Sequence, residues 1–116
     1  MDYREKIEAI IAKRQTAHAA LMAESTVYQA FLPMERAAFA AGALDKRTKE
    51  LIAVGISVTE GCESCMEWHI AQALLAGADK AQVMEAIGVG IGMGGGPATV
   101  SARFAIAALE YHLRRG

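Results

Sequence analysis

The residues best suited to chemistry in this sequence are two cysteines and a histidine that stand close together. Cys62 and Cys65 are its two cysteines, and His69 follows Cys65 by four residues. On a helix, with about 100° per residue, these three positions lie within an arc of roughly 60°. One helix face would therefore carry both sulfurs and the imidazole. Such thiols can attack a peroxide or a disulfide, and the imidazole can accept or relay their protons.

The thiolate is the reactive form of a cysteine, and three features favour it here. The motif opens a helix, where unpaired N–H groups carry a partial positive charge. His69 lies one turn beyond Cys65, and a carboxylate of the preceding helix, for which Glu50 is the candidate, could orient the imidazole. We expect these features to prevail at the inner cysteine, Cys65. Three acidic residues oppose them, but we expect these to be solvated and screened: Glu60, Glu63 and Glu67.

Other uses of the pair remain open. Cys62, Cys65 and His69 are three plausible zinc ligands with Glu50 as a fourth, although zinc usually prefers another cysteine or histidine there. The thiols could also be a packed pair without chemistry. Haem attachment of the c type is excluded because Met66, not histidine, follows the second cysteine. Redox chemistry without a cofactor is the favoured interpretation, and a stable structural disulfide is disfavoured in the cytoplasm.

Capping residues and glycines divide the chain into helices that would position these side chains. Asp2, Asp45 and Asp79 can cap helix starts, and Gly61 and Gly77 can end helices. Strand signals are nearly absent, so we predict an all-α helical bundle. The expected helices run from residue 3 to about 23, 25 to 31, 33 to about 41, 46 to about 59, about 62 to 76, 80 to about 91 and 97 to about 113, with 92–96 as a glycine loop.

Length and composition limit the possible functions. The chain has 116 residues, 53% of them hydrophobic and 22% charged, which predicts one folded domain over residues 1–116. The formal net charge of −1 gives no basic excess for binding nucleic acid. We find no targeting signal or membrane helix and expect a cytoplasmic protein. The high apolar fraction for so small a chain predicts a subunit interface.

The spacing Glu50-x11-Cys62-x2-Cys65-x3-His69 resembles the signature of the alkylhydroperoxidase D-like proteins of the carboxymuconolactone decarboxylase family. The stretch from Gly42 to Ile87 reads like the core of that family, and residues 93–98, MGGGPA, look like a loop of its one-domain members. The resemblance implies an all-helical single-domain protein that forms a homo-oligomer, commonly a trimer or hexamer. It also implies a peroxidase or disulfide reductase that uses a cysteine pair.

Site roles follow from this resemblance residue by residue. Cys65 would be the peroxidatic cysteine and Cys62 the resolving cysteine that meets the reductant, while Glu50 and His69 would relay protons. The best-known members have a second histidine between the cysteines, where this chain has Ser64. The implied substrate is a hydroperoxide, and the implied reductant is a lipoyl or thioredoxin-like dithiol. The alternatives are a decarboxylase-like lyase using His69 and Glu50, or a metal-binding assembly module.

Three further features are expected to serve the structure. His18 and His112 are expected to be ordinary surface or partly buried helix residues, and Trp68 is expected on the helix side away from the cysteines. Residues 90–95 match the letters of a nucleotide-binding glycine loop, but no strand precedes them. Close helix packing over small residues is the better interpretation of those glycines.

Overall fold

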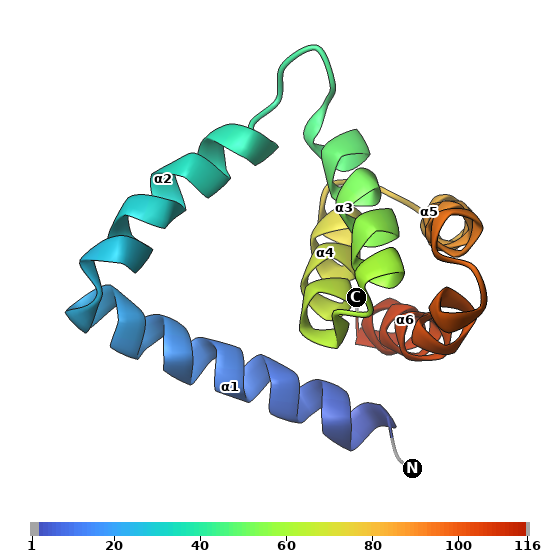
Figure 1. Ribbon diagram of the computed structural model, residues 1–116, viewed down its shortest axis with the longest axis horizontal. Helices are drawn as coiled ribbons and strands as arrows, with labels where there is room; N and C mark the ends of the chain where they lie inside the picture. Colours follow the sequence, from blue (N-terminus) through green and yellow to red (C-terminus); the bar gives the residue numbers. More distant parts are fainter. Residues whose placement is uncertain (1–2, 116) are drawn as a thin grey trace.

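The computed structural model describes residues 3–115, which form six α-helices joined by short connections (Figure 1). The prediction of an all-α fold is confirmed, and the expected cap at Asp2 lies outside the described residues. None of the six helices is both long enough and apolar enough to cross a membrane. The helices are α1 (Tyr3–Glu24), α2 (Thr26–Phe39), α3 (Lys46–Glu60), α4 (Glu63–Leu75), α5 (Lys80–Gly94) and α6 (Gly96–Arg115).

The hydrophobic core lies between α3, α4, α5 and α6, which pack together in Figure 1. Each of these helices buries one apolar stripe, so that the core holds α3 and α4 in a fixed relation. Removing a large side chain from such a core usually costs about 2–5 kcal/mol. Within these four helices, the largest hydrophobic core side chains are Val54 and Val58 of α3, Met66 and Ile70 of α4, Val83 and Ile87 of α5, and Phe104 and Leu109 of α6.

Two glycines allow α3 and α5 to approach closely. A Cβ atom on Gly90 would lie 2.6 Å from the carbonyl oxygen of Gly55 and 2.9 Å from Cβ of Val58, which is closer than real side chains come. Thr59 adds a hydrogen bond across the contact, because its Oγ1 donates to the carbonyl oxygen of Gly90 at 2.9 Å. The interpretation of these glycines as packing residues agrees with this contact.

The glycine cluster at residues 92–96 was expected to be a loop, and that expectation is wrong. Helix α5 continues to Gly94 and α6 begins at Gly96, so Gly95 alone separates them. Gly95 has φ 71° and ψ −150°, a backbone conformation that suits glycine. Gly94 packs so closely that an added Cβ would lie 2.7 Å from Cβ of Ala98. This close packing of the helix outweighs the weak helix propensity of glycine.

Helices α1 and α2 extend from this bundle as an N-terminal arm, residues 3–39 (Figure 1). Helix α1 buries Ile7, whereas α2 buries no residue. The expected break between Phe31 and Pro33 is wrong, because α2 is continuous and contains Pro33. The start near Ser25 was predicted correctly: its hydroxyl accepts the N–H of Tyr28 at 3.0 Å. The arm therefore has little core of its own, and its position depends on a few contacts.

Candidate active site

The turn between α3 and α4 places the two cysteines at a helix start. Gly61 ends α3 in the left-handed conformation, with φ 72°, which a residue with a side chain adopts only at a cost. The next N–H, that of Cys62, donates to the carbonyl oxygen of Ser57 at 3.1 Å. Cys62 is the N-cap of α4, and its sulfur accepts the N–H of Cys65 at 3.2 Å. The sequence predicted a helix beginning at about Cys62. In the structure Cys62 is the N-cap, and the first helical residue is Glu63, one position later.

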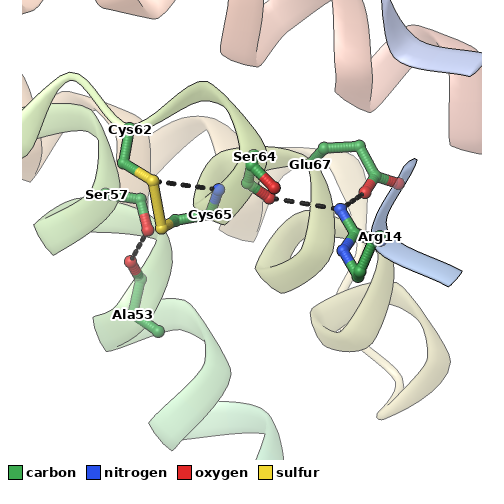
Figure 2. The surroundings of a disulfide bond; sticks show 7 residues. All are labelled: Arg14, Ala53, Ser57, Cys62, Ser64, Cys65 and Glu67. Carbon is green, nitrogen blue, oxygen red and sulfur yellow. Dashed lines mark hydrogen bonds and ion pairs between the residues drawn. A yellow bond between two sulfur atoms is a disulfide. The ribbon is translucent and has the colours of Figure 1, made fainter. Parts of the chain in front are cut away.

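Cys62 and Cys65 are joined by a disulfide bond, which Figure 2 shows beside Ser57. Their Cα atoms are 5.2 Å apart, within the usual range for disulfides. Both residues are partly accessible to solvent. The fold therefore lets the pair close a disulfide within one chain while leaving it within reach of a small reagent.

Glu50 and His69 form the pair expected from the sequence. Oε1 of Glu50 lies 2.7 Å from Nδ1 of His69, and the carboxylate is almost fully buried. Lys46 donates from Nζ to Oε2 of Glu50 at 2.9 Å, and Phe39 stacks on the imidazole with 5.2 Å between ring centroids. A carboxylate at Nδ1 fixes the proton there, so that Nε2 can accept a proton. This is the arrangement that a general base requires.

Two of these contacts were absent from the sequence prediction. Lys46 stands four residues before Glu50, a spacing at which helical side chains meet, so the ion pair could have been found. Phe39 lies on α2, and no local signal connects it with His69. Tertiary structure alone brings this ring to the site.

A pocket of about 470 Å³ lies beside Cys65. Cys65, Trp68 and His69 of α4 form one side, and the N-terminal arm forms the other. The prediction that Trp68 lies away from the cysteines is wrong. Three residues along a helix correspond to about 300°, which places Trp68 next to Cys65 on the helix surface. The arm contributes Arg14, Gln15, His18, Tyr28, Phe31, Leu32 and Glu35 to the lining.

The expectation that Glu67 is solvated is also wrong. Its side chain is 2% exposed and lies between α1 and α6. Arg14 forms an ion pair with Oε1, and Nε2 of His112 lies 2.7 Å from Oε2. Burial raises the pKa of Glu67, but the hydrogen bonds from His112 and Arg14 outweigh it and hold the pKa below its ordinary value. The negative charge is therefore retained and compensated. His112 is a partly buried helix residue, as expected, and it also binds the Glu67 carboxylate.

Arg14 connects this buried carboxylate with the start of α4. Figure 2 shows it reaching from α1, and its Nη2 also donates to the carbonyl oxygen of Ser64 at 3.3 Å. Its guanidinium lies over the ring of Trp68, 5.1 Å from the centroid. Among the other acids expected to be solvated, Glu60 is exposed, whereas Glu63 is ion-paired with Lys6 at 2.7 Å.

The four predicted site residues fall into two bonded pairs on α3 and α4. A disulfide joins Cys62 to Cys65, and a hydrogen bond joins Glu50 to His69. Cys65 and His69 line the same pocket. Within residues 3–115, no three His, Cys, Asp or Glu side chains are grouped so that they could hold a metal ion. The arrangement can carry out dithiol–disulfide chemistry with proton transfer through an imidazole.

Fold and site together define a small helical protein with a dithiol beside a histidine–carboxylate pair. The model of the carboxymuconolactone decarboxylase family matches residues 25–108. This chain therefore belongs to the carboxymuconolactone decarboxylase family, in agreement with the resemblance to its alkylhydroperoxidase D-like members.

Other proteins are similar to this chain in sequence and in structure. A Paracoccus denitrificans protein, uncharacterized protein 4 in cox locus, is 43% identical over 88 residues, which cover 76% of this chain and 79% of the relative. An uncharacterized Cupriavidus necator protein is 39% identical over 85 residues, 73% and 75% of the two chains. A carboxymuconolactone decarboxylase family protein from Legionella pneumophila has a TM-score of 0.88 at 32% identity, covering 93% of this chain and 97% of its own. The Thermotoga maritima protein TM1620 has a TM-score of 0.85 at 25% identity, with coverages of 93% and 95%.

Proposed function

We propose that this protein is a thiol-dependent peroxidase that reduces organic hydroperoxides with the Cys62–Cys65 dithiol. The observation that carries the proposal is the disulfide one helical turn from an imidazole whose Nδ1 is held by a buried carboxylate. Membership of the carboxymuconolactone decarboxylase family supports the proposal, because the signature of this chain resembles that of the alkylhydroperoxidase D-like members of the family. A packed cysteine pair would need neither the pocket nor the Glu50–His69 bond.

The first step oxidises Cys65. His69 takes the thiol proton at Nε2, directly or through water, and Glu50 stabilises the resulting imidazolium. The Cys65 thiolate then attacks the terminal oxygen of the hydroperoxide, so that an S–O bond forms as the O–O bond breaks. The products are a sulfenic acid on Cys65 and an alkoxide, which takes up a proton to become the alcohol.

The second step closes the disulfide. The Cys62 sulfur attacks the Cys65 sulfur and displaces the hydroxyl group, which leaves as water after taking the Cys62 proton. One hydroperoxide and two thiols thus give one alcohol, one water and one disulfide. An external dithiol of the lipoyl or thioredoxin-like class restores the pair by two exchange reactions. Partial exposure of Cys62 is compatible with its role as the sulfur that meets the reductant.

The first test follows the thiols of the fully reduced protein after one equivalent of tert-butyl hydroperoxide. We expect both thiols to disappear and the chain to lose about 2 Da, the two hydrogens of one closing disulfide. Free thiols or purely intermolecular bonds would contradict the proposal. One zinc per chain in the same sample would favour the metal-binding module, and carbon dioxide release from a lactone acid without thiol oxidation would favour the lyase.

The second test assigns the cysteine roles. The Cys62→Ser variant should consume one equivalent of peroxide, hold a sulfenic acid on Cys65 and fail to turn over. The Cys65→Ser variant is the matched control and should hold no sulfenic acid on Cys62. Trapping with a sulfenic-acid reagent followed by peptide mass spectrometry reads out both variants, and a label on Cys62 alone would exchange the two roles.

Assembly and location complete the proposal. We propose one cytoplasmic domain over residues 1–116 that forms a homo-oligomer, a trimer or a hexamer. An apolar groove between α3 and α5, about 670 Å³ in volume, supports the assembly. Four large side chains that line it are 48–79% exposed in the single chain: Ile52, Ile56, Val89 and Met93. A surface of this kind is typical of subunit interfaces.

A further inference from the structure

The N-terminal arm brings a second imidazole to the pocket beside Cys65. Nδ1 of His18, on α1, lies 2.6 Å from the hydroxyl oxygen of Tyr28, on α2. Their rings meet edge to face with 5.5 Å between centroids. Both side chains line the pocket that also contains Cys65 and His69. This pair holds no core together, because His18 is exposed and α2 buries no residue.

We infer that His18 and Tyr28 form a proton-donating pair that protonates the leaving oxygen of the hydroperoxide. The inference rests on the proposed peroxidase function and concerns the fate of the alkoxide. With the Tyr28 hydroxyl donating to Nδ1, the imidazole carries its proton on Nε2. Within residues 3–115 that nitrogen has no hydrogen-bond partner, so it is available to a ligand in the pocket.

The position of the pair suits this role better than that of His69. A thiolate displaces the leaving oxygen along the line of the O–O bond, so the alkoxide departs on the side away from Cys65. Cys65 and His69 belong to the same helix and occupy the α4 side of the pocket, whereas His18 and Tyr28 belong to the opposite side. His69 therefore lies on the side of the attacking sulfur, and the arm faces the departing oxygen.

The proton transfer balances without a further reagent. As the O–O bond breaks, Nε2 of His18 gives its proton to the alkoxide, and the alcohol forms. The Tyr28 hydroxyl passes its own proton to Nδ1, which leaves a phenolate and a neutral imidazole. After the alcohol departs, the proton that His69 took from Cys65 passes through solvent water to Nε2 of His18, and the Nδ1 proton returns to the Tyr28 phenolate. The electron pair that broke the O–O bond came from the Cys65 sulfur, as in the proposed first step.

The test compares two peroxides whose leaving groups differ in basicity. Tert-butyl hydroperoxide releases a strongly basic alkoxide, which needs a proton donor, whereas peracetic acid releases acetate, which does not. Trp68 is the chain's one tryptophan and lies in the same pocket, so its fluorescence can follow Cys65 oxidation in a stopped-flow instrument. The variants are His18→Gln and Tyr28→Phe, and Tyr111→Phe removes a hydroxyl from a residue outside this pocket as the matched control.

We expect both variants to lose about 10²-fold in rate with tert-butyl hydroperoxide, the low end of the range for a positioned acid. The rate with peracetic acid should stay near that of the unaltered protein, as should both rates of the Tyr111→Phe control. An equal loss with both peroxides would overturn the inference, because it would show that the pair only shapes the pocket. Unchanged rates with both would overturn it as well.

The same experiment separates this inference from the proposed function. An unaltered protein that reacts with neither peroxide refutes the peroxidase function and the inference that rests on it. If the unaltered protein oxidises Cys65 and the ratio of the two rates is the same in both variants, the inference alone fails. Reaction with peracetic acid also shows that a variant is folded and that its Cys65 thiolate is competent.

Discussion

Replacement of Glu67 by Gln tests whether the buried network between α1, α4 and α6 stabilises the fold. The substitution keeps the shape of the side chain and removes its charge. Hydrogen bonds to charged groups contribute about 1.5–3 kcal/mol each, and breaking a buried ion pair costs about 3–5 kcal/mol. Arg14 is 26% exposed and can regain water, and the amide oxygen can still accept one bond. We therefore expect the free energy of unfolding to fall by about 2–3 kcal/mol.

The effect should depend on pH in a defined direction. Because the pKa of Glu67 is lowered in the folded protein, its contribution is complete above the unfolded pKa of about 4.3. It is lost as the pH falls through the lower folded pKa. The groups that face the carboxylate are Arg14 and His112. The difference between the unaltered protein and the Glu67→Gln variant should therefore shrink as the pH falls through the acid range.

Urea unfolding followed by circular dichroism at several pH values measures this difference. Glu63→Gln is the matched control on the same helix, since Glu63 is 37% exposed and pairs with Lys6 at the surface. Such surface pairs contribute about 0.2–1 kcal/mol. If Glu67→Gln costs no more than Glu63→Gln, or if its effect is the same in acid as at neutral pH, the network does not stabilise the fold in the way argued.

Three further predictions concern the site, the helix packing and the assembly. Glu50→Gln should slow peroxide-dependent turnover by roughly 10²–10⁴-fold and raise the pKa of the Cys65 thiol, which thiol alkylation at several pH values measures. His69→Ala should slow turnover by a similar factor, and the double variant should be little slower than either single variant, because the two residues act as a unit. Gly90→Ala should destabilise the protein by about 1–3 kcal/mol in urea unfolding, because its Cβ meets α3, whereas Gly88→Ala, which meets nothing within 4 Å, should not. Light scattering should show an oligomer that Ile56→Asp dissociates, and a 12.3 kDa monomer of the unaltered protein at micromolar concentration would contradict the proposed assembly.

The local features of the fold were predictable because they depend on short-range chemistry. Asp45 and Asp79 cap the helices expected of them, since a carboxylate three residues before a free N–H accepts it in any context. Gly61 ends α3 for an equally local reason, its left-handed φ. The Glu50–His69 contact joins two helices. Glu50 was a candidate partner of His69 from the residues alone, and the family resemblance singled it out.

The remaining features depend on tertiary contacts that periodicity does not contain. Helix α5 runs through its glycines because α3 lies against them, and Glu67 is buried because α1 and α6 cover it. Neither neighbour could be located from the sequence of the element itself. The same holds for the pocket, whose arm side is about 30–50 residues away along the chain from Cys65.

The buried network and the proposed chemistry are linked through the arm. Cys65 and His69 sit on a helix fixed by the core, but His18 and Tyr28 sit on helices that bury little beyond Ile7. Arg14, which binds Glu67 and the Ser64 carbonyl, is the polar link from the arm that reaches the α4 turn beside Cys65, while the Lys6–Glu63 pair joins α1 to the first residue of α4 at the surface. Weakening that link should move the arm side of the pocket and leave the disulfide pair in place. The Glu67→Gln variant should therefore slow oxidation by alkyl hydroperoxides more than it slows disulfide exchange with a dithiol, and equal losses in both reactions would mean that the network supports α4 itself.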